Sequence, residues 1–163
     1  MQLGLRYEYF DYDNFLFVDA DGNLEVKPEG LFTYYLSAHM ETLDKRYYPN
    51  QGMAIRGSYS LYTDNLFTHN EGAPLSAIGF SFESVLSISR RVKLLPSLYG
   101  RILIGNDFSY PLLNYVGGNI AGRYMSQQLP FIGVQSIEGV DNSVAIARLQ
   151  ARYRLGSRHY VSV

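Results

Sequence analysis

The sequence contains no cysteine and no tryptophan among its 163 residues. Without cysteine, the chain can form neither a disulfide framework nor a thiolate-based metal site. No stretch approaches the roughly 18 consecutive apolar residues that mark a transmembrane helix. Charged residues are sparse, at 18%, against roughly 25% in soluble domains. The net charge of −1 gives no reason to expect a polyanionic partner such as nucleic acid.

Tyrosine, phenylalanine and glycine are abundant, with 15, 9 and 15 copies. Aromatic residues favour strands, so the composition points to β-structure. Apolar and polar residues alternate in several segments. In one of them, Ile55, Tyr59 and Leu61 share a face opposite Arg56 and Ser58. A period of two predicts strands with one apolar and one polar face. The clearest such segments are 2–10, 31–43, 53–62, 77–89, 92–105 and 143–155.

The segment 143–155 is the one serious helix candidate, because alanine, leucine, arginine and glutamine favour helices. We favour a strand there, since a helix would stack Arg148 on Arg152, which is mildly unfavourable. Between 119 and 137 the alternation weakens, and we expect one or two strands. The prediction is an all-β fold: an antiparallel meander of about eight strands that forms a partial or closed β-barrel. Residues 1–163 are expected to be a single barrel domain or a piece of a larger barrel.

The polar face carries charges as well as small residues. In a soluble antiparallel sheet this face would meet solvent and the apolar face would be the core. In an outer-membrane barrel the apolar face would meet lipid and the polar face a hydrated lumen. Low charge content and long strands favour the membrane barrel. The charges expected to face the lumen are Arg56, Arg101, Arg148, Arg152, Arg154, Glu41 and Glu83.

Several short motifs follow one another in a fixed order. They are a Tyr-Pro-x-x-Gly turn (Tyr48, Pro49, Gly52), a Gly-Gly pair before Gly-Arg-Tyr (Gly117, Gly118, Arg123), Gln-Leu-Pro-Phe (Gln128, Pro130, Phe131), and Arg-Tyr-Arg running into His-Tyr-Val. Together they resemble the outer-membrane β-barrel of the bacterial surface antigen (BamA-like) superfamily. More narrowly, they resemble the C-terminal barrel of patatin-like phospholipase surface proteins.

The resemblance implies a location in the bacterial outer membrane, with the lipid bilayer as a partner. It implies a barrel that anchors, or helps to translocate, an attached domain, here a patatin-like phospholipase. In the superfamily a loop arginine reaches into the lumen. Arg123 would be its counterpart, although the order here is Gly-Arg-Tyr instead of Arg-Gly-Tyr or Arg-Gly-Phe. The family barrel has more strands than this chain, and no signal peptide precedes the first alternating segment. We therefore expect an internal piece of a larger barrel.

No catalytic residue, cofactor or metal is expected in this chain. A patatin-type nucleophile needs Gly-x-Ser-x-Gly, whereas the sequence around Ser81 lacks the second glycine and lies in a strand pattern. The active site of a phospholipase parent would lie outside the chain. The three histidines are scattered, and Asp19 and Asp21 are better explained as turn residues than as a calcium loop.

The arginines at 148, 152 and 154 could bind an anion. Pairing of these lumenal charges with Glu41, Glu83 or Glu138 is the favoured alternative.

Two rival functions remain open. One is a soluble, eight-stranded, lipocalin-like barrel that binds an apolar ligand with its apolar face inward. The other is a hydrolase that uses Ser81. The membrane interpretation carries its own consequence, because an open sheet has two unpaired edges. We expect the isolated chain to close on itself or to self-associate through these edges.

Overall fold

The computed structural model describes residues 1–11, 28–45, 48–106, 108–118, 127–131, 139–156 and 159–162. Within them the protein is built from strands and one short 3-10 turn, and no helix is long and apolar enough to cross a membrane. The elements are β1 (Gln2–Phe10), β2 (Glu29–Glu41), β3 (Gly52–Thr63), β4 (Leu75–Ser87), β5 (Val92–Ile104), η1 (Tyr110–Leu112), β6 (Asn114–Val116), β7 (Gln128–Leu129), β8 (Gly139–Asp141), β9 (Ser143–Arg154) and β10 (Tyr160–Ser162).

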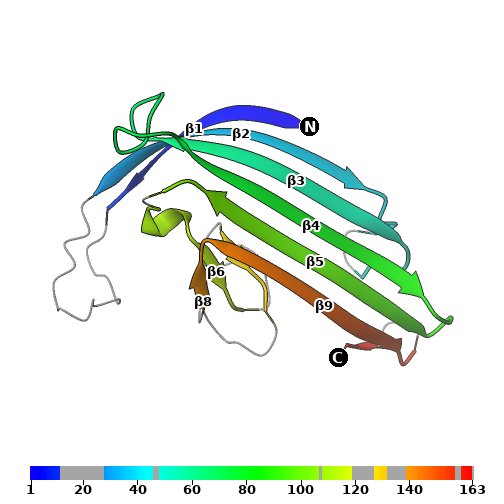
Figure 1. The fold of residues 1–163 in the computed structure, drawn as a ribbon. Coiled ribbons are helices and arrows are strands. Elements are labelled where there is room, and N and C mark those ends of the chain that lie inside the picture. Colours follow the sequence, from blue (N-terminus) through cyan, green and yellow to red (C-terminus); the bar gives the residue numbers. More distant parts are fainter. Residues whose placement is uncertain are drawn as a thin grey trace.

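Seven of the strands form one twisted sheet in the order β1-β2-β3-β4-β5-β9-β10 (Figure 1). Every neighbouring pair in this sheet is antiparallel. The remaining strands form a small sheet in the order β7-β6-β8. The all-β class is therefore confirmed in its partial-barrel form: the large sheet is open, with β1 and β10 at its edges.

The long strands lie close to the segments that alternate in the sequence. The segment 143–155 is confirmed as a strand, β9. The weakly patterned stretch contains β7, whereas β6 and β8 lie just outside it. Strands of two or three residues are too short to show a period, and β6 pairs with β7 in parallel, which a simple meander does not include.

The two faces of the large sheet separate by alternation. One row across it runs from Ile55 to Phe82 to Leu98. We call this the outer face, and its apolar side chains are exposed along every long strand. Leu3 in β1 is 82% exposed and Leu149 in β9 is 66% exposed. The opposite, inner face carries the polar residues.

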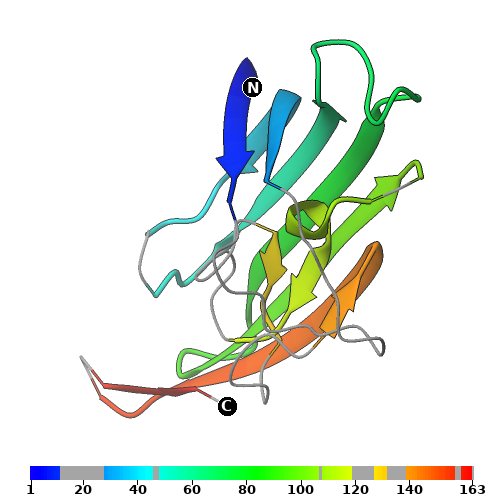
Figure 2. The same cartoon turned by 90° about the vertical axis from the view of Figure 1, so that its left-hand side faces the viewer.

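One end of the inner face is covered by η1 and the small sheet, which lie in front of the large sheet in Figure 2. A hydrophobic cluster forms there between the two layers. Because a fully buried leucine contributes about 1.5–3 kcal/mol, this cluster holds the covering segment in place. Its buried members are Leu31, Tyr62, Leu75, Ala77, Leu103 and Leu112, with Phe10, Phe108 and Leu113 packed against them.

Arg101 in β5 connects the covering segment to the sheet. Its Nη1 donates to the carbonyl oxygen of Leu112 at 2.7 Å and to Oδ1 of Asn114 at 2.6 Å. Its Nη2 reaches the Tyr62 hydroxyl at 3.2 Å, and the Asn114 amide donates back to the carbonyl of Arg101. Asn114 is fully buried. One guanidinium therefore satisfies groups on both layers.

The β2–β3 connection is closed by a side chain. Oδ1 of Asp44 accepts the backbone N–H of Asn50 at 2.7 Å and that of Gln51 at 3.3 Å. The bond from Asn50 is the main reason that the pKa of the Asp44 carboxyl is lowered. Gly52 follows with φ of 104°, and a Cβ there would collide with the carbonyl oxygen of Thr42. The glycine of the Tyr-Pro-x-x-Gly motif is thus required by the turn.

Replacing Arg101 by methionine is expected to release the covering segment. The buried Oδ1 of Asn114 would lose its donor, and charge-assisted hydrogen bonds are worth about 1.5–3 kcal/mol. Hydrogen exchange at the amides of 110–116 should accelerate roughly tenfold to a hundredfold, with little change in β3 and β4. Arg56→Met is the matched control, because Arg56 lies exposed on the same face. Equal exchange in the Arg101 variant and the unsubstituted chain would contradict this role.

Candidate functional site: the polar inner face

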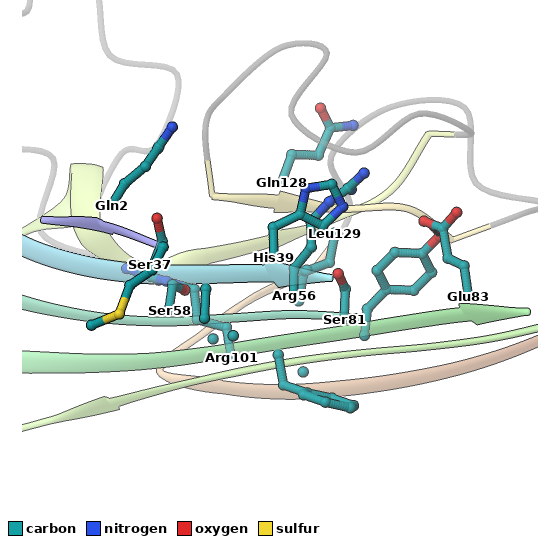
Figure 3. A pocket seen from close by; sticks show the side chains of 17 residues that line it. Gln2, Ser37, His39, Arg56, Ser58, Ser81, Glu83, Arg101, Gln128 and Leu129 are labelled. Atoms are coloured by element: carbon teal, nitrogen blue, oxygen red, sulfur yellow. Dashed lines mark hydrogen bonds between the residues drawn. The ribbon is translucent and has the colours of Figure 1, made fainter. Parts of the chain in front are cut away.

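The part of the inner face that the small sheet leaves open forms a cleft of about 680 Å³. Serines, glycines and charged residues from β2 to β5 form its floor, and β7 carries Gln128 and Leu129 over it (Figure 3). Arg56 and Ser58 are exposed in this cleft. The small residues keep the space open, and the polar ones keep it hydrated.

Two carboxylates of the inner face have partners on the same face. Glu41 pairs with Nε2 of His39 at 3.2 Å. Oε1 of Glu83 accepts the hydroxyl of Tyr99 at 2.9 Å. The arginines predicted to neutralise these carboxylates have other contacts.

Nε of Arg148 donates to Ser97 Oγ at 3.2 Å, and its guanidinium lies 6.0 Å from the centre of the Tyr99 ring. Nη1 of Arg152 donates to the carbonyl of Pro49 at 3.0 Å. Arg154 is exposed at the end of β9. Pairing of these arginines with Glu41 or Glu83 is therefore not seen in the described residues. Glu138 lies outside them.

Two of the sequence motifs meet at the end of the large sheet that carries the β2–β3 and β4–β5 turns, which we call the turn end. Tyr48 stacks on Tyr160 of β10, with ring centroids 5.5 Å apart, and the guanidinium of Arg152 lies 5.4 Å from the centre of the Tyr48 ring. The Tyr-Pro-x-x-Gly turn is thereby held against the Arg-Tyr-Arg strand, which is distant in the sequence. The carbonyl of Pro49 takes part in the same contact through Arg152.

The other two motifs also meet. The N–H of Gly117 donates to the carbonyl of Leu129 at 3.1 Å, and the Gln128 amide donates to the carbonyl of Gly117 at 2.6 Å. The N–H of Phe131 donates to the carbonyl of Gly118 at 2.9 Å. Pro130 is buried beside them. Gly117 and Gly118 have φ of 150° and 71°, which lie in the region that glycine tolerates best. Arg123 lies outside the described residues.

This arrangement offers no catalytic geometry among the residues that the structure describes. Ser81 lies within β4, opposite Arg56 in the β3 ladder, instead of on a strand-to-helix turn. The described histidines and carboxylates form no cluster able to hold a metal ion.

Two important partners of Arg101 could not be found from the sequence. Tyr62 and Asn114 complete its bonding, but neither belongs to a motif. Asn114 lies outside every segment for which the sequence predicts a strand. Its only signal is being a polar residue between apolar ones, which does not separate a buried asparagine from an ordinary turn residue.

The orientation of the faces argues against the lipocalin-like alternative. A soluble barrel of that kind would turn its apolar residues inward around a ligand. Here the exposed apolar residues lie on the outer face, and the inner face is polar except at the end where η1 and the small sheet pack on it.

Comparison with known proteins agrees with the membrane interpretation. A family model described as the OMP85 superfamily matches residues 1–163. The comparisons with curated proteins and with solved structures each gave no match. The resemblance to BamA-like barrels is thus confirmed at the level of the superfamily. Because the match spans the whole sequence, the chain belongs to the OMP85 superfamily, a family of non-enzymatic β-barrels of the bacterial outer membrane.

Proposed function

We propose that this barrel segment anchors, or helps to translocate, an attached domain, and that this domain is a patatin-like phospholipase. The observation that carries the proposal is the pairing of an exposed apolar outer face with an open polar inner face. The first face suits lipid and the second suits a hydrated lumen. The identity of the attached domain rests on the resemblance of the motifs alone.

The proposal places the charged residues in the lumen. The charged residues of the long strands share the inner face, because strand pairing aligns Arg56 with Ser81 and Ser97 with Arg148 and side chains alternate along each strand. They are Arg56, Arg101, Arg148, Glu41 and Glu83. Polar and ionisable groups within a membrane protein almost always face its interior or a water-filled cavity. A lipid-facing position for this face would leave these charges in hydrocarbon.

A lysine placed on either face tests this orientation. Leu98→Lys on the outer face should cost about 2–4 kcal/mol if the site lies near the bilayer midplane. Ser58→Lys, on the exposed inner face, should have an effect of roughly 0–1 kcal/mol because the ammonium group stays hydrated. Denaturant unfolding of the chain from phospholipid vesicles measures both. Equal losses for the two variants would refute the assignment of the faces.

The attached domain is tested with the protein expressed from its own gene. Phospholipase activity should be found in the outer-membrane fraction and should move to the soluble fraction when Leu98 and Ile102 are both replaced by lysine. Protease treatment of intact cells then separates translocation from anchoring, because only a translocated domain is digested. Absence of phospholipase activity from all fractions would reject the patatin assignment. Phospholipase activity that stays in the membrane fraction after both lysine replacements would reject anchoring by this barrel.

The open edges support a further part of the proposal, that the isolated chain self-associates. β1 pairs only with β2, and most of β9 pairs only with β5. Backbone groups left unpaired in lipid are costly, so a sheet edge in the hydrocarbon layer needs a partner strand. The free edges of β1 and β9 in two copies could supply this partner.

Crosslinking tests this association on a background without natural cysteine. A chain carrying Arg6→Cys in β1 and Gln150→Cys in β9 should form disulfide-linked dimers on mild oxidation in detergent. Ser58→Cys, in the interior of the sheet, is the control and should remain monomeric. Light scattering that shows only monomers of the unsubstituted chain, together with no crosslinked species, would refute self-association.

A further inference from the structure

A small cavity of about 160 Å³ lies at the turn end of the sheet, apart from the large cleft. Of the seven described residues that line it, five are cationic and none is acidic. The lining consists of Arg90, Arg91, Lys93, Arg152 and Arg154, with Asn50 and Tyr160. They come from the β4–β5 turn, from β5, β9 and β10, and from the β2–β3 turn. Several elements distant in the sequence therefore direct positive charge into one space.

The sheet register brings these charges together. Lys93 in β5 lies directly opposite Arg152 in β9, and Arg154 follows on the same face. The N–H of Arg154 donates to the carbonyl of Arg91 at 2.8 Å, which fixes the turn beside them. Like charges directly opposite each other in a ladder destabilise it. Among the described residues, Nζ of Lys93 bonds a neutral hydroxyl, that of Ser87 at 2.6 Å, and no carboxylate.

Two described carboxylates on the neighbouring elements have partners of their own. Asp44 accepts the amides of Asn50 and Gln51 in the β2–β3 turn, and Glu83 accepts the hydroxyl of Tyr99. Neither lines the cavity. No described residue that lines the cavity therefore carries a negative charge to offset the repulsion among these cations.

Arg152 adds a second, independent observation. The residue is only 7% exposed, and its Nε has no hydrogen-bond partner in the described part of the chain. Its Nη1 is held by the carbonyl of Pro49, and the Tyr48 ring lies under the guanidinium. A buried cation is costly unless neighbouring polar or anionic groups compensate its charge. The guanidinium is thus fixed in position at the wall of the cavity, with its Nε shielded from solvent.

The size and donor set fit a phosphate group. The cavity has the volume of roughly five water molecules at ~30 Å³ each, which leaves room for a tetrahedral oxyanion with a little water. Arginine presents a planar fork that matches phosphate oxygens, while lysine acts as a point charge. Asn50 and Tyr160 are the neutral polar residues of the lining, and the Asn50 amide also donates to Oδ2 of Asp44 at 3.4 Å. A single carboxylate would leave most of these donors unused.

We propose that this cavity binds a phosphate-bearing anion, held by Arg152 from within and by Lys93 and Arg154 at the rim. The phosphate could belong to a soluble compound or to a lipid headgroup. Basic pockets on membrane proteins recognise lipid headgroups by the same chemistry.

Isothermal titration calorimetry on the full chain in neutral detergent tests the proposal. One arm uses inorganic pyrophosphate, and the other uses micelles containing short-chain phosphatidylglycerol, with phosphatidylcholine as the uncharged comparison. Binding is expected in at least one arm and should weaken as salt is raised. Lys93→Gln combined with Arg154→Gln should lower the affinity roughly a hundredfold, about tenfold for each charge lost. Circular dichroism confirms that this double variant keeps its strands.

Arg56→Gln is the matched control, because it removes one cation from the inner face far from the cavity. It should leave the affinity unchanged. Binding of pyrophosphate alone identifies a soluble ligand, and binding of phosphatidylglycerol alone identifies a lipid headgroup. The proposal is overturned if neither binds at millimolar concentration. It is also overturned if the double variant binds as tightly as the unsubstituted chain, or if Arg56→Gln weakens binding equally.

Discussion

The constraint on which the structure depends is that backbone polar groups in lipid must be paired within the protein. Antiparallel pairing meets this demand along six consecutive ladders, from β1 to β10. Pairing fixes the backbone, and the alternation of side chains then creates two different surfaces. Membership of the OMP85 superfamily explains why the exposed surface is the apolar one. In water the same sheet would present its hydrophobic residues to the wrong solvent.

The same constraint applies to the inner face, whose polar groups need hydrogen-bond partners from protein or from water. The two parts of this face meet the need differently. At one end, residues 108–118 return to the sheet and bury Leu112 beside Leu31 and Leu75. Arg101 secures this return by bonding to backbone and side-chain oxygens that would otherwise be buried without donors. Farther along, serines and glycines leave the cleft open.

The large sheet can be predicted from the sequence because burial on one face imposes a period of two over about twelve residues. Alternation alone assigns Ile55 and Arg56 to opposite faces. The small sheet could not be predicted, since β6 to β8 are two or three residues long and no period can develop. The contact between Arg101 and Asn114 could not be predicted for a different reason. It depends on how a loop folds back, and a single asparagine carries no sign of its partner.

The strand register could not be predicted from the sequence either, and the register decides which charged residues become neighbours. The net charge of −1 gave no reason to expect a polyanionic partner. That sum averages over positions that the fold separates. Lys93 and Arg152 are far apart in the chain but directly opposite in the sheet, and a tight turn adds two further arginines to them. Glu29 begins β2, Asp64 follows β3 and Asp141 precedes β9, so these three carboxylates lie at the opposite end of the large sheet. Asp44, in the β2–β3 turn, accepts the backbone N–H groups of Asn50 and Gln51. Screening at physiological salt acts over about 8 Å, so charges at the far end of a long strand cannot neutralise the cluster. The local charge, and not the total, decides what the turn end of this barrel attracts.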